Sequence, residues 1–195
     1  MQRAILVVDP NADRRERLRV LLTSDGSRLV GEAADPDEAM RLAALTHPDA
    51  AVVAEDAENA APGQLANRLA TEHGIPCVLL TAAADPVAIG RAARNGVMGF
   101  VVKPADSAFL HATLEMAVCR FQEVLGLQRE IELLRRTLEE RKVIERAKGL
   151  LMERDRVSEQ EAFARLRRKS MDTQRPLVEI GRAVILAAEL SGQSR

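Results

Sequence analysis

The stretch from Glu145 to Arg175 reads ERAKGLLMERDRVSEQEAFARLRRKSMDTQR, and it decides the fold of the C-terminal part of the chain. Apolar residues between Ala147 and Leu151 recur at helical spacing, which predicts one buried face of a helix. Ser158 is followed three residues later by Glu161, the pattern of a capping box that opens a second helix. This second helix carries a cluster of positive charge, at Arg165, Arg167, Arg168 and Lys169.

A third helix is predicted from Pro176, because proline is favoured at the first position of a helix. We expect this helix to bury its apolar residues, which are Leu177, Ile180, Val184, Ile185 and Leu186. From the first two helices we expect Leu151 and Phe163 to join the same core. The result is a small all-α three-helix bundle over residues 141–195.

Upstream of the bundle the sequence predicts one long helix, since no proline occurs between residues 107 and 152. Five apolar residues follow one another at spacings of 3, 4, 3 and 4, which is the seam of a coiled coil: Val124, Leu127, Ile131, Leu134 and Leu138. We expect this seam, in a connector over residues 121–140, to join two copies of the chain. The alternative is that the helix packs on its own domains.

The first 120 residues alternate between short apolar runs and helical segments. The runs cover residues 4–8, 28–33, 50–54, 76–81 and 99–102, and the helices cover 13–22, 36–45, 63–72, 86–95 and the residues that follow Asp106. This alternation predicts an α/β domain with a doubly wound, five-stranded parallel sheet. Functional groups collect at the carboxyl ends of such strands, and here those ends carry Asp9, Ala54 to Asp56, Thr81 and Lys103.

Asp9 after the first run, Thr81 after the fourth and Lys103-Pro104 after the fifth resemble the receiver domain of response regulators. The resemblance implies paired acids that hold Mg²⁺ and an aspartate after the third strand that accepts a phosphoryl group. This chain has Pro10 in place of the second acid and Ala54 in place of the acceptor. Because a methyl group cannot be phosphorylated, we expect a pseudo-receiver that uses no metal and no cofactor.

Glu55 and Asp56 directly follow the missing acceptor and leave three interpretations open. They are solvated loop acids, a displaced phospho-acceptor, or a permanent mimic of the charged state. Without an orthodox acceptor, control by a protein partner that docks on the receiver domain is favoured over phosphorylation.

Four ordered segments of the C-terminal part resemble the ANTAR domain: residues 144–152 (IERAKGLLM), Ser158 with 161–163, residues 166–168, and Met171-Asp172. The resemblance implies a protein that binds tandem RNA hairpins in leader transcripts and prevents transcription termination. Two hairpins fit two copies of the domain, and hence the dimer expected from the seam. RNA contacts are expected from Arg146, Lys148, Arg167, Arg168 and Lys169, since arginine forks onto phosphate or stacks on a base.

The composition is compatible with these two parts. Residues 1–120 carry a net charge of −4 and residues 121–195 a net charge of +3. The absence of Trp and Tyr argues against an RNA site built on many stacked aromatic rings. Cys77 and Cys119 lack metal-ligand spacing, and no apolar run is long enough to span a membrane. We therefore expect a cytoplasmic regulator rather than an enzyme.

Overall fold

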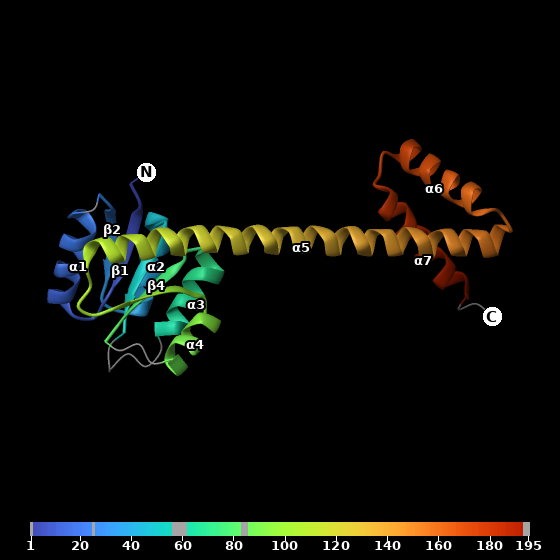
Figure 1. Cartoon of the computed structure of the whole chain (residues 1–195). Coiled ribbons are helices and arrows are strands. Elements are labelled where there is room, and N and C mark those ends of the chain that lie inside the picture. Colours follow the sequence, from blue (N-terminus) through green and yellow to red (C-terminus); the bar gives the residue numbers. More distant parts are fainter. Residues whose placement is uncertain (1, 25, 56–61, 83–85, 193–195) are drawn as a thin grey trace. The chain divides into compact units, whose positions relative to one another are not determined.

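The computed structural model describes residues 2–24, 26–55, 62–82 and 86–192 (Figure 1). The chain divides into two compact units, Met1–Leu125 and Gly126–Arg195. Helix α5, Ser107–Asp155, begins in the first unit and ends in the second, so the predicted long helix is confirmed. Asp106 caps its start, because the Asp106 carboxylate accepts from the backbone N–H of Ala108 at 2.7 Å. Among the described residues, no helix has an apolar stretch that could cross a membrane.

The first unit is built on five parallel strands in the order β2-β1-β3-β4-β5, which confirms the predicted sheet. The strands are β1 Ala4–Val8, β2 Arg28–Ala33, β3 Ala50–Ala54, β4 Cys77–Thr81 and β5 Val97–Val102. The strand that follows β1 in sequence lies on one side of it, and β3 with the later strands lies on the other side. At this junction Val8 of β1 pairs with Val53 of β3. The residues just beyond that pair, Asp9 and Ala54, therefore meet at the switch point at which such sheets place their sites.

Helices cover both faces of this sheet: α1 Ala12–Ser24, α2 Pro36–Thr46, α3 Pro62–His73, α4 Pro86–Arg94 and the first turns of α5. Side chains alternate between the faces along each strand. Ile5 and Val7 pack with Leu18 of α1 and Leu110 of α5 in one core. Leu6 and Val8 belong to the opposite core, with residues of α2, α3 and α4. Both faces of β1 are thus buried, which explains its continuous apolar run.

The second unit joins the end of α5 to α6 Glu159–Thr173 and α7 Leu177–Gly192. Its core contains Ala147, Leu151, Ala162, Leu166 and Ile180. The predicted cap of α6 is present, since the Ser158 hydroxyl accepts from the backbone N–H of Glu161 at 3.3 Å. Helix α7 lies close to α5 at Gly181, where an added Cβ would come within 3.1 Å of a Val143 methyl group.

Two side chains that the sequence predicted to be buried in this bundle are exposed. Phe163 is 41% exposed and Leu186 is 58% exposed, so both predictions are wrong. Ala162 and Leu166 define the buried face of α6, and Phe163 lies about 100° further around the helix from Ala162. Leu186 lies about 120° around α7 from the buried Ile180.

Candidate functional site

The first candidate site lies at the carboxyl ends of β1, β3, β4 and β5. Asp9 follows β1 and is fully buried. The first turn of α1 brings Arg14 back to it, and the Arg14 guanidinium donates to both carboxylate oxygens at 2.8–3.0 Å. The backbone N–H of Asn11 donates to the same carboxylate at 2.9 Å, and Arg15 donates to the Asp9 carbonyl at 2.7 Å. Both oxygens of the predicted pocket acid are therefore hydrogen-bonded by donors of its own chain.

Two other predicted pocket residues, Thr81 and Lys103, contact Glu55. The Thr81 hydroxyl donates to the Glu55 carboxylate at 2.5 Å. The Lys103 ammonium donates to the Glu55 backbone carbonyl at 3.0 Å. Ala54 is buried within the sheet core and Pro10 is exposed, while Asp56 lies outside the described residues. The Glu55 carboxylate is thus bound by the pocket hydroxyl, which is more than a solvated loop acid would show.

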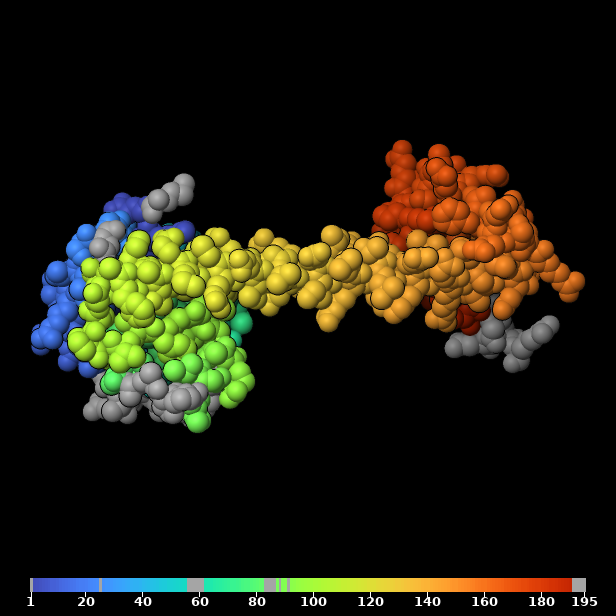
Figure 2. All heavy atoms as spheres, in the orientation of Figure 1, coloured from blue at the N-terminus to red at the C-terminus, as the bar shows by residue number. Residues whose placement is uncertain are grey.

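The second candidate site is on α6, whose side chains Figure 2 shows in orange at the surface of the second unit. A shallow pocket on this helix, here called the α6 face, is lined by Gln160, Phe163, Ala164, Arg167, Arg168, Met171 and Asp172. The Arg167 and Arg168 side chains are exposed beside Phe163 and Met171. Sequence reasoning missed the two apolar members. Phe163 and Met171 each lie four residues from Arg167, and this spacing places the three side chains on one stripe of the helix.

Lys148 occupies a different environment from these arginines. It is buried, and its ammonium pairs with Glu145 at 2.8 Å and with Glu159 of α6 at 2.6 Å. It also lies 6.0 Å from the centre of the Phe163 ring, at the limit of a cation–π contact. The hydrogen bonds that the Lys148 ammonium donates to Glu145 and Glu159 raise the pKa of Lys148 above its ordinary value. Its charge is thus neutralised within the fold, and it joins α5 to α6.

The remaining predicted RNA-binding residues are exposed. Arg146 pairs with Glu189 of α7 at 3.0 Å, while Lys169 lies on α6 outside the residues that line the α6 face. Arg165, the other cation of the basic cluster, pairs with Asp155 and Glu161 at 3.0 Å each. Arg167 and Arg168 are therefore the two predicted cations that the structure brings together on one face.

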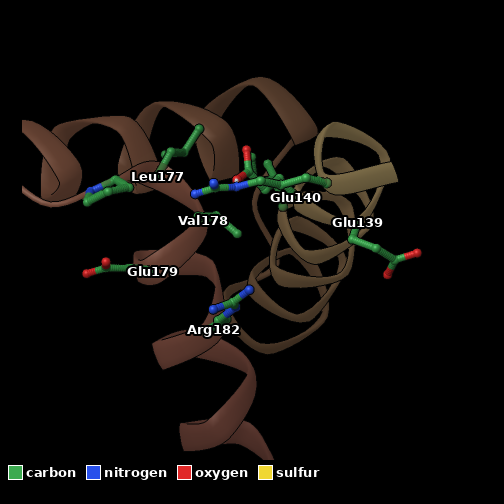
Figure 3. Close-up of a pocket in the computed structure, with 9 residues that line it drawn as sticks. Glu139, Glu140, Leu177, Val178, Glu179 and Arg182 are labelled. Atoms are coloured by element: carbon green, nitrogen blue, oxygen red, sulfur yellow. Dashed lines mark hydrogen bonds and ion pairs between the residues drawn. The ribbon is translucent and has the colours of Figure 1, made fainter. Parts of the chain in front are cut away.

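A further pocket lies in the second unit, between α5 and the start of α7 (Figure 3). Its apolar lining comes from Ile144, Pro176, Leu177 and Val178, and its charged lining from Arg136, Glu139, Glu140, Glu179 and Arg182. The lining contains three carboxylates and two guanidiniums, and the Arg136 guanidinium pairs with Glu140 at 3.1 Å. A pocket with this charge balance does not attract the phosphates of a nucleic acid.

Comparison with known proteins gives two family matches. The response regulator receiver domain matches residues 5–115, and the ANTAR domain matches residues 132–185. The transcriptional regulatory protein PdtaR of Mycobacterium tuberculosis is 33% identical over 183 residues, which are 94% of this chain and 89% of that protein. The nitrate regulatory protein of Klebsiella oxytoca is 38% identical over 68 residues, 35% of this chain and 17% of that protein.

Among solved structures, a receiver domain of a modulated diguanylate cyclase from Desulfovibrio desulfuricans G20 superposes with a TM-score of 0.57. The two are 28% identical, and the match covers 63% of this chain and 98% of that one. The sheet and its flanking helices are those of the response-regulator class. Within that class, the chain belongs to the response regulators in which a receiver domain is followed by an ANTAR domain.

Proposed function

We propose that this chain is a transcription antitermination regulator that binds tandem RNA hairpins in leader transcripts through its ANTAR domain. The observation that carries the proposal is the α6 face, which lies inside the ANTAR match. Arg167 and Arg168 supply charges that can fork onto phosphates, and Phe163 supplies a half-exposed ring on which an unpaired base can stack. Hairpin loops offer both kinds of group.

The α5 seam supports a dimer as the binding form. Its five apolar residues are all 40–62% exposed in the single chain: Val124, Leu127, Ile131, Leu134 and Leu138. Covering such side chains contributes roughly 1.5–3 kcal/mol each before the entropy of association is subtracted. A second copy that covers this seam brings a second ANTAR domain, which matches the two hairpins of a tandem target. The domains proposed are residues 1–120, 121–140 and 141–195.

Three other predicted cations have smaller parts in this proposal. Arg146 and Lys169 are exposed and serve as peripheral phosphate contacts. Lys148 supports the site from below, because it pairs with Glu145 and Glu159 and contacts Phe163. Control of the receiver by a protein partner is the second part of the proposal, and the absence of an acceptor at Ala54 supports it.

The test is binding of the full chain to a pool of tandem-hairpin RNAs with randomised loops, followed by anisotropy titrations with the selected RNA. We expect the chain to prefer tandem hairpins over a single hairpin, and hairpins over unstructured RNA, with an affinity that falls as salt rises. Equal affinity for hairpins and unstructured RNA would contradict the proposal.

The dimer is tested in the same assay with Leu134→Glu, which puts a charge into the seam. This variant should lose the preference for tandem over single hairpins and sediment as a monomer, while it keeps its affinity for a single hairpin. Leu133→Glu is the matched control, because Leu133 is 65% exposed and lies off the seam. A Leu134→Glu chain that still sediments as a dimer would exclude the seam as the interface.

A further inference from the structure

The receiver pocket of this chain does not fit the divalent cation that its family implies. A hard cation such as Mg²⁺ requires several oxygen ligands, which carboxylates supply best. Pro10 and Ala54 supply none from their side chains, and both oxygens of Asp9 already accept hydrogen bonds. In the part of the chain that the structure describes, no three His, Cys, Asp or Glu side chains converge as metal ligands.

A positive charge is nevertheless needed where Asp9 lies. The Asp9 side chain is fully buried, and a buried carboxylate is strongly unfavourable unless it is paired and hydrogen-bonded. The Arg14 guanidinium meets this need, with Nε within 3.0 Å of both oxygens and a terminal nitrogen 2.8 Å from Oδ1. The Arg14 side chain itself is 31% exposed, so it keeps contact with solvent while it neutralises the acid.

The groups that would meet a phosphoryl group are also engaged. In a receiver, a hydroxyl and a lysine hydrogen-bond the phosphoryl oxygens and neutralise their charge. Here the Thr81 hydroxyl donates to the Glu55 carboxylate, and Lys103 donates to the Glu55 carbonyl. The chain therefore supplies both partners itself: the Glu55 carboxylate accepts from Thr81, and the Arg14 guanidinium neutralises Asp9.

We propose that Arg14 is the built-in counter-cation of this receiver, in the role that a divalent metal ion has in other response regulators. The pocket keeps its arrangement without metal, and neither Mg²⁺ nor a phosphoryl group sets its state. This inference is independent of the proposed RNA binding. It assigns to Arg14 a role that composition and motif spacing did not indicate.

The experiment uses the full chain and follows its melting temperature with and without millimolar MgCl₂, at constant ionic strength. The wild-type melting temperature should not respond to Mg²⁺. Arg14→Gln should melt roughly 5–15 °C lower, because it leaves Asp9 buried and uncompensated. In this variant Mg²⁺ should raise the melting temperature, since the freed Asp9 carboxylate can pair with a Mg²⁺ ion that keeps most of its water ligands. Arg17→Gln is the control, because Arg17 is an exposed arginine of the same helix.

A second variant keeps the proposal testable if Arg14→Gln folds poorly. Asp9→Asn/Arg14→Gln removes both charges, so it should be more stable than Arg14→Gln alone and should not respond to Mg²⁺. Two outcomes would overturn the proposal. One is a wild-type chain that Mg²⁺ stabilises as much as it stabilises Arg14→Gln. The other is a double variant that is no more stable than Arg14→Gln.

Discussion

Arginine has opposite roles in the two units of this chain. In the receiver pocket, Arg14 is hydrogen-bonded to both oxygens of the buried Asp9 and balances its charge inside the fold. On the α6 face, Arg167 and Arg168 are exposed beside Phe163 and line a shallow pocket. The first arrangement stabilises a structure, and the second is open to a ligand. The acid of the receiver pocket is therefore paired within the chain, while the arginines of the α6 face are exposed.

The difference shows that a motif residue is best interpreted through its partners. Lys148 belongs to the ANTAR pattern, yet its two carboxylate partners make it resemble Arg14 more than Arg167. Three predictions test the contrast between charges that are paired within the fold and charges that are exposed. The first concerns the core beneath the α6 face.

The largest effect is expected from Leu166→Ala. Leu166 is buried in the small core under the α6 face, and removing such a side chain costs about 2–5 kcal/mol. The bundle should lose α6, and RNA binding should disappear with it, as measured by circular dichroism and anisotropy. Leu69→Ala, the matched change in the receiver core, should lower the stability of the sheet and leave RNA affinity unchanged. If Leu166→Ala kept the wild-type RNA affinity, the RNA-binding site would not depend on α6.

A smaller effect is expected from Lys148→Met. The change removes the cation between Glu145 and Glu159 and leaves two carboxylates close together. The melting temperature should fall, because these pairs tie the end of α5 to the start of α6. Lys169→Met, at an exposed position of α6, should leave the melting temperature as it is. If Lys148→Met melted like the wild type and only RNA affinity fell, Lys148 would be an RNA contact.

The smallest effect is the response of the two units to acid. The hydrogen bond from Lys148 lowers the pKa of Glu159, and the hydrogen bond from Arg3 lowers the pKa of Glu115, each below its ordinary 4.5. Groups with lowered pKa values stabilise the fold above their unfolded pKa, and this stability is lost as pH falls through the folded value. Both units should therefore lose stability below about pH 4.5.

The acid response separates the two units through single substitutions. The melting temperature is followed between neutral and acid pH. Glu159→Gln should reduce the loss of melting temperature in acid for the bundle, and Glu115→Gln should reduce it for the receiver. If each substitution changed the acid response of the other unit, or if neither changed any acid response, other groups would determine the loss of stability.

Periodicity made most of the fold predictable. Buried parallel strands are continuously apolar and helices repeat every 3.6 residues, so the five strands and the long α5 follow from the sequence. The cap at Ser158 was predictable because a short polar side chain before a helix satisfies free backbone N–H groups. The exposure of Phe163 was not, because its position lies at the border of the apolar face and packing decides such cases.

The partners of charged residues were harder to predict than the helices that carry them. Arg14 lies five residues after Asp9, across a loop and the first turn of α1, and no periodic rule pairs those positions. Lys148 reaches Glu159 on another helix, a contact that depends on how α6 packs against α5. The sequence indicated where charge collects, whereas side-chain geometry determines which charges remain available.

The dependence of hairpin-RNA affinity on salt tests the central claim most directly, with wild type compared with Arg167→Gln/Arg168→Gln. Both arginines are exposed, so the double variant should keep the wild-type circular dichroism spectrum. The account predicts that it binds about 10–100-fold more weakly and that its salt slope is smaller by roughly 1 for each arginine. A double variant with wild-type affinity and wild-type slope would contradict the account.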